Sequence, residues 1–511
     1  MRRHALFSIL LLLISIQARH PGQAASLSCS LVFTQIPYRP ESHESNSARF
    51  LRNRAGEKRS RIVALRPDGT LKVLTPDFAC ASDPSVSFDA RRIVFAGKRS
   101  ITDRWNIWEM DVDGKNKRQI TKDLGDCREP EYLAKSSITP PDFEDKVRWV
   151  TFVSNGAGVY AETGMELATS LYAASTEPIA GRGFVTWRTT FNLANDFSPT
   201  VLNDGRVLFT SAAVGRRSPP LLTQGNGNSN NLPMEYPLLV ANWDGTGLNL
   251  FCGNEQGLPF KTMACEMPDR TLVFVESGES GSAGGQLARV SFRRPLHSYV
   301  QLSGGEGYYL HPHPFADGKL AVSFTPGKQS YGIYALDLAN GSAAAKLFDD
   351  PDWEDLDAQM LVPRPEPQGL ISSVMDSLTW GHLHCLNVYE SDQPEAALIK
   401  KGDVKRVRFI EGVPARASNR RRAAPQETET RILGEAPVEA DGSFFVELPG
   451  DTPFSIQLLD EGGRALQSMH RWIWVRRGTS RGCIGCHENK ELAPENRVTD
   501  AVRRAAPHVL K

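Results

Sequence analysis

Short apolar runs of similar character recur along the first two thirds of the chain. Each run has four residues rich in β-branched and aromatic side chains, and polar turn residues flank it, a pattern typical of β-strands. The six runs are Leu31–Thr34, Ile93–Ala96, Val150–Val153, Val207–Thr210, Leu272–Val275 and Ala321–Phe324. A recurrence of roughly 45 to 65 residues indicates one repeated supersecondary unit rather than unrelated strands.

Tight turns accompany the runs. Asp204-Gly205 and Asp317-Gly318 come just before two of them. Asp-Gly between apolar segments is a hairpin signal, because both turn positions tolerate positive φ. Residues 61–99 and 106–132 combine a strand, an Asp-Gly turn, a Leu-Thr or Ile-Thr pair and an apolar run. This combination resembles the PD40 repeat of TolB-like proteins, and the resemblance implies a β-propeller.

Six runs predict a six-bladed propeller over residues 25–360. Leu31–Ile36 is expected to close the ring beside Asp357-Ala358-Gln359, which would shorten the exposed sheet edges. Two β-sandwiches with accidental repetition are the alternative.

The stretch from His311 to Pro314 (His-Pro-His-Pro) occupies the phase in which other repeats carry Asp83-Pro84 or Ser198-Pro199. Such loops are expected to gather at one mouth of the propeller. A pair of hydrogen-bonded loop histidines is the simpler interpretation of His311 and His313.

Clustered prolines at Val362–Pro367 mark a domain boundary, because they remove backbone donors and stiffen the chain. Short β-type runs separated by Gly, Pro and Asp follow, and they predict a smaller β-sandwich-like domain. The runs are Leu383–Tyr389, Val404–Glu411, Arg431–Val438, Ser443–Leu448, Phe454–Asp460 and Ala465–Val475. The expected fold class is therefore all-β. The predicted segments are 1–24 (signal peptide), 25–360 (propeller), 361–475 (β-rich domain) and 476–511 (C-terminal segment).

The charge balance argues against two classes of partner. The chain has 59 Lys and Arg side chains and 59 Asp and Glu side chains, a formal net charge of +0. No global field therefore favours nucleic acid or an anionic membrane. Nucleophile-elbow, His-Glu-x-x-His and phosphate-loop motifs are absent from the sequence, so no motif supports a hydrolase function.

The N-terminus is typical of an export signal. Met1–His4 is positively charged, Ala5–Ile16 is apolar, and Gly22–Ala24 supplies small residues for a signal peptidase. The apolar run is short for the ~30 Å hydrocarbon layer, and no later stretch is a candidate membrane span. We therefore expect a Sec-type signal peptide, no transmembrane segment and a periplasmic or secreted protein. Lipid attachment at Cys29 is disfavoured, because the preceding leucine is poorly placed.

Cys483-Ile484-Gly485-Cys486-His487 carries the clearest chemistry. Two thiols at this spacing can add to the two vinyl groups of one haem, and the next imidazole can bind the iron. A redox disulfide or a zinc clip is the alternative, although no second Cys pair follows. The motif and the export signal support each other, because bacteria attach haem c outside the cytoplasm.

Three passages resemble the middle domain of the hydrazine synthase alpha subunit: residues 361–365, 404–414 and 434–488. The resemblance implies one covalent haem c, with thioethers at Cys483 and Cys486 and His487 as the proximal iron ligand. In that family a tyrosine four residues after the motif histidine binds the iron, and a further domain holds a second haem. Here Glu491 occupies the tyrosine position and the sequence stops at Lys511, so hydrazine synthesis is not expected.

The group on the other face of the iron decides between electron transfer and small-molecule chemistry. If Ala465–Val475 is one strand, His470 shares a face with Trp472 and Trp474, and His470 becomes the candidate distal ligand. Alternatively, the tryptophans fill the sandwich core. Weaker candidates are His311, His313, His382 and His384.

Three functions follow from these features. The preferred one is an exported monohaem c-type cytochrome that transfers electrons within a periplasmic redox complex, with a redox partner or other subunits. The alternatives are a small-molecule redox enzyme with an open five-coordinate haem, and a propeller-based binding protein with a structural haem.

Six further cysteines are present, and disulfides Cys252–Cys265 and Cys80–Cys127 are the first pairs to test.

Overall fold

A computed structural model describes residues 29–39, 59–134, 147–162, 164, 166–179, 181–214, 234–253, 256–278, 284–305, 307–315, 317–327, 329–338, 345–391, 398–415, 428–469, 471–485, 493–504 and 506–510. Within these ranges the structure contains no helix that is long and apolar enough to span a membrane. The predicted signal peptide lies outside the described residues.

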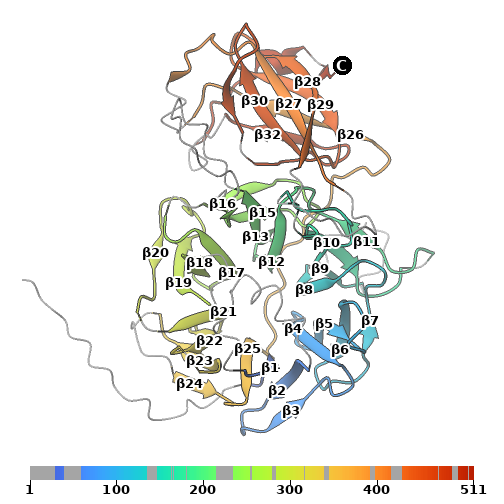
Figure 1. The fold of residues 1–511 in the computed structure, drawn as a ribbon, viewed down its shortest axis with the longest axis vertical. Helices are drawn as coiled ribbons and strands as arrows, with labels where there is room; N and C mark the ends of the chain where they lie inside the picture. The colour runs from blue at the N-terminus through green and yellow to red at the C-terminus, as the bar shows by residue number, and fades with distance from the viewer. Residues whose placement is uncertain are drawn as a thin grey trace, which may run out of the picture.

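Antiparallel sheets follow one another around a ring (Figure 1), and in the described part of residues 31–360 there are six of them. Each has four strands in sequence order except the first, which combines both ends of the ring, and the fourth, which has an additional strand, β14 (Met234–Glu235). The first sheet is β25 (Trp353–Met360), β1 (Leu31–Pro37), β2 (Arg61–Leu65) and β3 (Leu71–Val73). The second is β4 (Cys80–Val86), β5 (Arg92–Lys98), β6 (Asn106–Asp111) and β7 (Arg118–Gln119). The third is β8 (Cys127–Leu133), β9 (Trp149–Ser154), β10 (Ser170–Ser175) and β11 (Thr186–Arg188).

The remaining three sheets complete the ring. The fourth is β12 (Asn195–Val201), β13 (Val207–Val214), β15 (Leu238–Ala241) and β16 (Asn249–Cys252). The fifth is β17 (Phe260–Glu266), β18 (Thr271–Ser277), β19 (Gln286–Ser291) and β20 (Val300–Gln301). The sixth is β21 (Tyr308–Pro314), β22 (Leu320–Thr325), β23 (Gly332–Leu336) and β24 (Ala345–Phe348). The predicted all-β fold, with a propeller followed by a smaller β domain, is confirmed.

The ring closes by pairing its first strand with its last. Strand β1 lies antiparallel to β25, with Val32 opposite Gln359 and Thr34 opposite Leu356. Buried Gln35 donates a hydrogen bond to Asp355 across this pair at 2.8 Å. The predicted closure beside residues 357–359 is therefore confirmed, and β1 is paired on both sides, with β25 and with β2.

The innermost strand of each sheet contains a β-bulge, where the pairing register shifts. One residue in each bulge has a left-handed backbone, with φ between 45° and 55°, which is uncommon for residues other than glycine. The six residues are Asp83, Glu129, Ser198, Met263, His311 and Asp357. Proline follows four of them, and a bulge is one of the few strand positions that accept proline. Asp83-Pro84, Ser198-Pro199 and His311-Pro312 were expected to be loops at one mouth, but they lie inside strands facing the central channel.

Bulge side chains link neighbouring sheets. Asp83 accepts hydrogen bonds from the Arg128 side chain at 2.7 and 2.9 Å and from the backbone N–H of Glu129 at 3.1 Å. Glu129 in turn accepts from the backbone N–H of Ser198 at 2.6 Å. The Ser198 and Thr262 hydroxyl oxygens are 3.0 Å apart. Successive sheets are thus joined by polar contacts around the channel as well as by apolar packing.

The two suggested disulfides are not formed in the structure. Cys127 and Cys265 are both buried free thiols, which removes one partner from each suggested pair. Burial raises the pKa of Cys127 to about 11, so its thiol stays protonated and unreactive at neutral pH.

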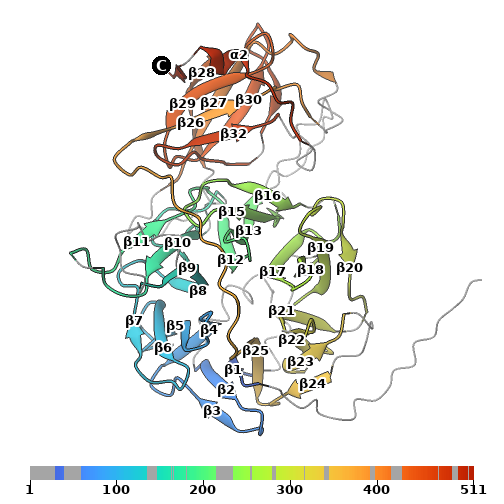
Figure 2. The same cartoon turned by 180° about the vertical axis from the view of Figure 1, so that it is seen from behind.

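Two four-stranded sheets form the second domain above the ring (Figures 1 and 2). One sheet is β32 (Ser480–Cys483), β26 (Trp380–Cys385), β29 (Phe444–Pro449) and β33 (His508–Val509). The other is β28 (Glu429–Pro437), β27 (Arg406–Val413), β30 (Phe454–Leu459) and β31 (Ala465–Ser468). A short helix, α2 (Asp500–Arg503), precedes β33. The sheets pack through Phe409, Phe444 and Phe454, whose ring centroids lie 5.9 to 6.0 Å apart where they meet.

We predict that ionisation of the channel carboxyl Glu129 destabilises the propeller. Burial, together with the nearby carboxylate of Asp83, raises the pKa of Glu129 to about 7. Because this pKa is higher in the folded protein than in the unfolded chain, the free energy of unfolding decreases as pH rises from about 4.5 to 7. Glu129→Gln keeps an acceptor for Ser198 but cannot ionise. The melting temperature of wild type minus that of the variant should therefore fall by roughly a few degrees between pH 5 and pH 8. A constant difference across this range would contradict the assignment.

Candidate functional site

Cys483 is the last residue of the edge strand β32, and β32 pairs in parallel with β26. Cys385 lies opposite Cys483 in this register, so the two side chains share the face that packs on the hydrophobic core. Cys385 is buried, whereas Cys483 is half-buried. Cys483 is therefore held by a sheet and, unlike Cys385, keeps part of its surface exposed at the sheet edge.

Backbone contacts fix the residues that follow. The carbonyl of Cys483 accepts a hydrogen bond from Leu386 N–H at 2.9 Å, and that of Ile484 accepts from Asn387 N–H at 3.1 Å. A Cβ atom added at Gly485 would overlap the carbonyl oxygen of Glu390. The start of the motif thus runs closely along residues 386–390, and only glycine fits at its third position.

Several residues singled out in the sequence lie outside the described residues. These are Cys486, His487, Glu491 and the candidate distal ligand His470. The second thioether position and both predicted iron ligands therefore stay predictions.

His382 and His384 lie on the face of β26 opposite to Cys483. Side chains alternate along β26, with Leu383 and Cys385 buried and the two histidines half-buried. His384 lies over β32, because a Cβ added at Gly482 would be 2.8 Å from its Nε2. Burial lowers the pKa of His384, which keeps the imidazole neutral at pH 7. Neither histidine is presented on the face that carries the Cys483 thiol.

His311 and His313 face a different site. Both line a cavity of 1190 Å³ in the centre of the propeller. Among the described residues, those that line this cavity come from residues 34–367, so the two sheets of the second domain, which begin with β26 at Trp380, do not contribute to it. The proposal that these histidines reach the predicted haem therefore has no support in the arrangement of the two domains. Burial lowers the pKa of His313 to about 3, so His313 is neutral.

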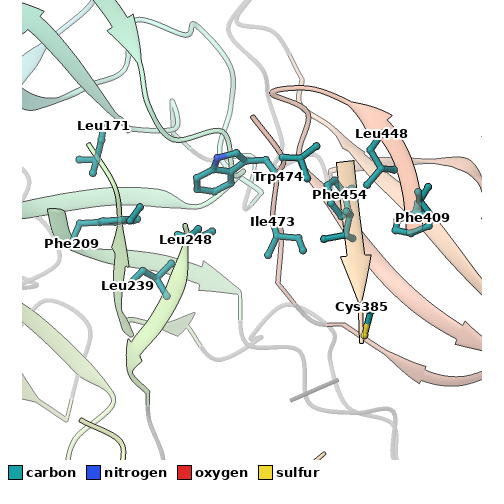
Figure 3. Close-up of a cluster of buried hydrophobic side chains, with 14 of the residues drawn as sticks. Leu171, Phe209, Leu239, Leu248, Cys385, Phe409, Leu448, Phe454, Ile473 and Trp474 are labelled. Atoms are coloured by element: carbon teal, nitrogen blue, oxygen red, sulfur yellow. The ribbon is translucent and has the colours of Figure 1, made fainter. Parts of the chain in front are cut away.

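Trp472 and Trp474 attach the second domain to the propeller. Trp474 is 1% exposed and its indole N–H donates to the carbonyl of Gly245 at 3.0 Å. The indole of Trp472 donates to Glu162 at 2.9 Å. One apolar cluster runs from Leu171, Phe209, Leu239 and Leu248 of the propeller through Trp474 to Phe454 and Phe409 (Figure 3). These tryptophans therefore lie at the junction of the domains.

The expected strand over Ala465–Val475 is shorter in the structure. Strand β31 ends at Ser468, and four consecutive residues, 472–475, are buried. Period-two alternation thus stops before His470, and the propeller surface rather than the strand pleat decides which side chains are buried. Among the described residues 471–475 no strand continues β31, and the shared face of His470 with Trp472 and Trp474 stays a prediction.

Arginines complete the junction and lead into β32. Arg476 donates to the carbonyl of Arg188 at 2.9 Å and pairs with Asp451 at 3.0 Å. Arg481, within β32, donates to the carbonyl of Leu248 at 3.0 Å. The strand that ends at Cys483 is therefore fixed to the propeller as well as to its own sheet.

Sequence reasoning missed two contributors to this region. The Asp244-Gly245 turn has the same hairpin signal as Asp204-Gly205, and that signal does not mark it as the acceptor for Trp474. Gly245 has φ of 80°, and a Cβ there would overlap the carbonyl of Thr189. Cys385 was considered only as a disulfide candidate, and no sequence signal placed it beside Cys483, because parallel pairing of distant segments leaves no local pattern.

We predict that Trp474→Ala loosens the attachment of the second domain. Truncating a buried tryptophan of this kind costs about 3–5 kcal/mol in the free energy of unfolding. The variant should melt at lower temperature and be cleaved faster by protease between residues 361 and 379. Trp380→Ala is the matched control, because Trp380 is half-buried and outside the junction cluster. Equal proteolysis of the two variants would show that Trp474 does not hold the domains together.

Comparisons with known proteins agree with this arrangement. Residues 402–488 match the family model of the hydrazine synthase alpha subunit middle domain. The hydrazine synthase subunit alpha of Kuenenia stuttgartiensis is 28% identical to this chain, over 82% of this chain and 61% of the relative. The chain thus spans about three fifths of that relative's length. The structure of hydrazine synthase from the same organism superposes with a TM-score of 0.81 at 26% identity, covering 94% of this chain and 71% of the other. The chain is therefore related to the hydrazine synthase alpha subunit.

Proposed function

We propose that the chain is an exported monohaem c-type cytochrome that serves as the electron-transfer subunit of a periplasmic redox complex. The observation that carries the proposal is the position of Cys483. Its thiol is half-buried at the end of an edge strand, and the strand is fixed to both domains. A covalent cofactor attached there would be held rigidly at one place on the molecule.

The residues near Cys483 fit such a group. The close approach of Gly485 to Glu390 directs the chain along residues 386–390, so the motif leaves the sheet in a defined direction. In the proposal Cys483 and Cys486 form the thioethers, His487 is the proximal iron ligand and His470 is the distal candidate. Bound there, one haem c would supply one-electron redox chemistry. The propeller would span residues 25–360, the β-rich domain 361–475 and the haem-bearing segment 476–511.

The relationship with a protein named as a subunit supports assembly with other proteins. The relative is the alpha subunit of hydrazine synthase, and this chain spans about three fifths of its length. We infer that this chain also works beside other subunits or a redox partner. The alternative function is small-molecule chemistry at an open haem. Optical spectra distinguish this function from electron transfer.

Expression with a cytochrome c maturation system should give covalent haem. The expected reduced spectrum is sharp, low-spin and unchanged by carbon monoxide, because two strong ligands would leave no open iron face. A high-spin spectrum that shifts with carbon monoxide would favour small-molecule chemistry over electron transfer. Absence of covalent haem would overturn the proposal.

Two cysteine variants test the attachment. Cys483→Ala should leave one thioether, which shifts the alkaline pyridine haemochrome band relative to wild type. Cys385→Ala should leave both thioethers intact, although Cys385 lies directly opposite Cys483. The same band shift in both variants would mean that the shift reflects disturbed packing and not a lost bond.

His470→Ala tests the distal ligand. Loss of this imidazole should convert a low-spin ferric spectrum into a high-spin one that binds carbon monoxide after reduction. His384→Ala is the matched control, because His384 lies on the opposite face of β26 from Cys483. A low-spin spectrum in His470→Ala together with a high-spin spectrum in His384→Ala would reverse the assignment.

A further inference from the structure

The central cavity of the propeller is closed on one side by the chain itself. Residues 362–367 line the cavity, and the chain crosses the ring there on its way to the second domain (Figure 2). Arg364 fixes this crossing, because its backbone N–H donates to Phe88 O at 2.8 Å and its side chain donates to Val86 O at 2.7 Å. One opening of the 1190 Å³ cavity is therefore crossed by residues 362–367.

Acidic side chains outnumber basic ones in the lining, by eight (Asp83, Asp126, Glu129, Glu131, Glu166, Glu266, Asp357, Glu366) to three (Lys98, Arg128, Arg364). The pairing of these charges is uneven. Arg128 is bonded twice to Asp83, and Arg364 interacts electrostatically with Glu131. No described basic side chain stabilises the ionised form of Asp357 in this way. For Glu129, Arg128 stabilises the ionised form, but burial and the charge of Asp83 oppose ionisation more strongly.

Two described residues of the lining carry buried hydroxyls without a hydrogen-bond partner. Thr34 Oγ1 and Ser82 Oγ are each in residues only 3% exposed, and neither has a hydrogen-bond partner among the described residues. Thr34 pairs with Leu356 beside the Asp357 bulge, and Ser82 directly precedes the Asp83 bulge. Buried hydroxyls are normally bonded, so these two leave hydrogen-bonding capacity unused beside the bulges.

We propose that this cavity binds a small organic cation with primary ammonium groups, held by Asp357 and Glu129 and by the hydroxyls beside them. Ammonium N–H groups donate to carboxylates and to hydroxyl oxygens, which are the two acceptor types that the wall leaves available. The bulges present both carboxyl groups toward the channel, where each is half-buried. The inference does not depend on the haem, so either proposal can fail without the other.

A directly chelated metal ion fits the cavity less well. Among the described residues, no group of three His, Cys, Asp or Glu side chains is arranged to hold one. The cavity is also much larger than a single ion requires. An organic dication can span the distance between separate carboxylates, whereas a metal ion needs them close together.

The ionisation of the carboxyl groups supports the same conclusion. Burial and the neighbouring carboxyls of Asp83, Glu131 and Glu129 raise the pKa of Asp357 far above its usual value, although Gln359 bonds to the ionised form. A bound cation would favour the ionised carboxylates. Binding at pH 6.5 should therefore release protons from Asp357 and Glu129 to the buffer.

Isothermal titration of the full mature protein with 1,4-diaminobutane tests the proposal. Wild type should bind, and the heat should differ between buffers of different ionisation enthalpy because protons are released. Asp357→Asn should weaken binding at least tenfold, and asparagine tolerates the left-handed backbone of residue 357. Glu129→Gln is the second variant, and both should keep melting temperatures close to that of wild type at pH 6.5.

Two controls separate binding in the cavity from general charge attraction. Asp317→Asn removes a carboxylate that is exposed and paired with Lys319, and should leave affinity unchanged. 1,4-Butanediol has a similar length but no charge, and should not bind. The proposal would be overturned if wild type did not bind the diamine, if Asp357→Asn bound it as tightly as wild type, or if binding released no protons. Binding of calcium chloride without binding of the diamine would also overturn it.

Discussion

Closure of the ring by β1 and β25 is the constraint on which the rest of the structure depends. This pairing joins residues more than 300 positions apart, and buried Gln35 and Asp355 are bonded across it. A closed ring fixes each sheet between two neighbours, so the innermost strands must face one another. The bulge in each inner strand then directs one side chain into the channel. The polar links between sheets and the lining of the cavity both follow from that closure.

The second domain extends this rigid unit. A single apolar cluster includes core residues of both domains, and Trp474 lies where they meet (Figure 3). Burial of this large aromatic side chain stabilises the junction, while its indole N–H fixes the orientation. Because Arg481 bonds to the propeller from within β32, the position of Cys483 depends on the junction too. A redox centre attached at Cys483 would have a fixed relation to the propeller and hence to any protein bound to it.

Two regions of the molecule thus carry different chemistry. The edge of the β26 sheet holds half-buried Cys483, and the propeller channel holds carboxyl groups whose ionisation is opposed by burial and by one another. The described lining of the channel includes the crossing segment 362–367 but no residue of the two sheets of the second domain, so the channel and the β26 sheet edge are separate regions. Ligand binding and redox chemistry can therefore be tested one at a time.

The sequence by itself determined the all-β class, the repeated sheets, the closure of the ring and the Cys-x-x-Cys-His motif, because strand alternation, turns and short motifs are local signals. It also placed His311-Pro312 in phase with Asp83-Pro84, but it assigned them to loops. Only the tertiary structure decided that these residues form bulges, that Trp472 and Trp474 face the propeller, and that Cys385 lies opposite Cys483. Each of these depends on contacts between segments far apart in the chain, for which no local periodicity exists. The end of β31 at Ser468 has the same cause, since packing against a neighbouring domain overrides the period of the strand.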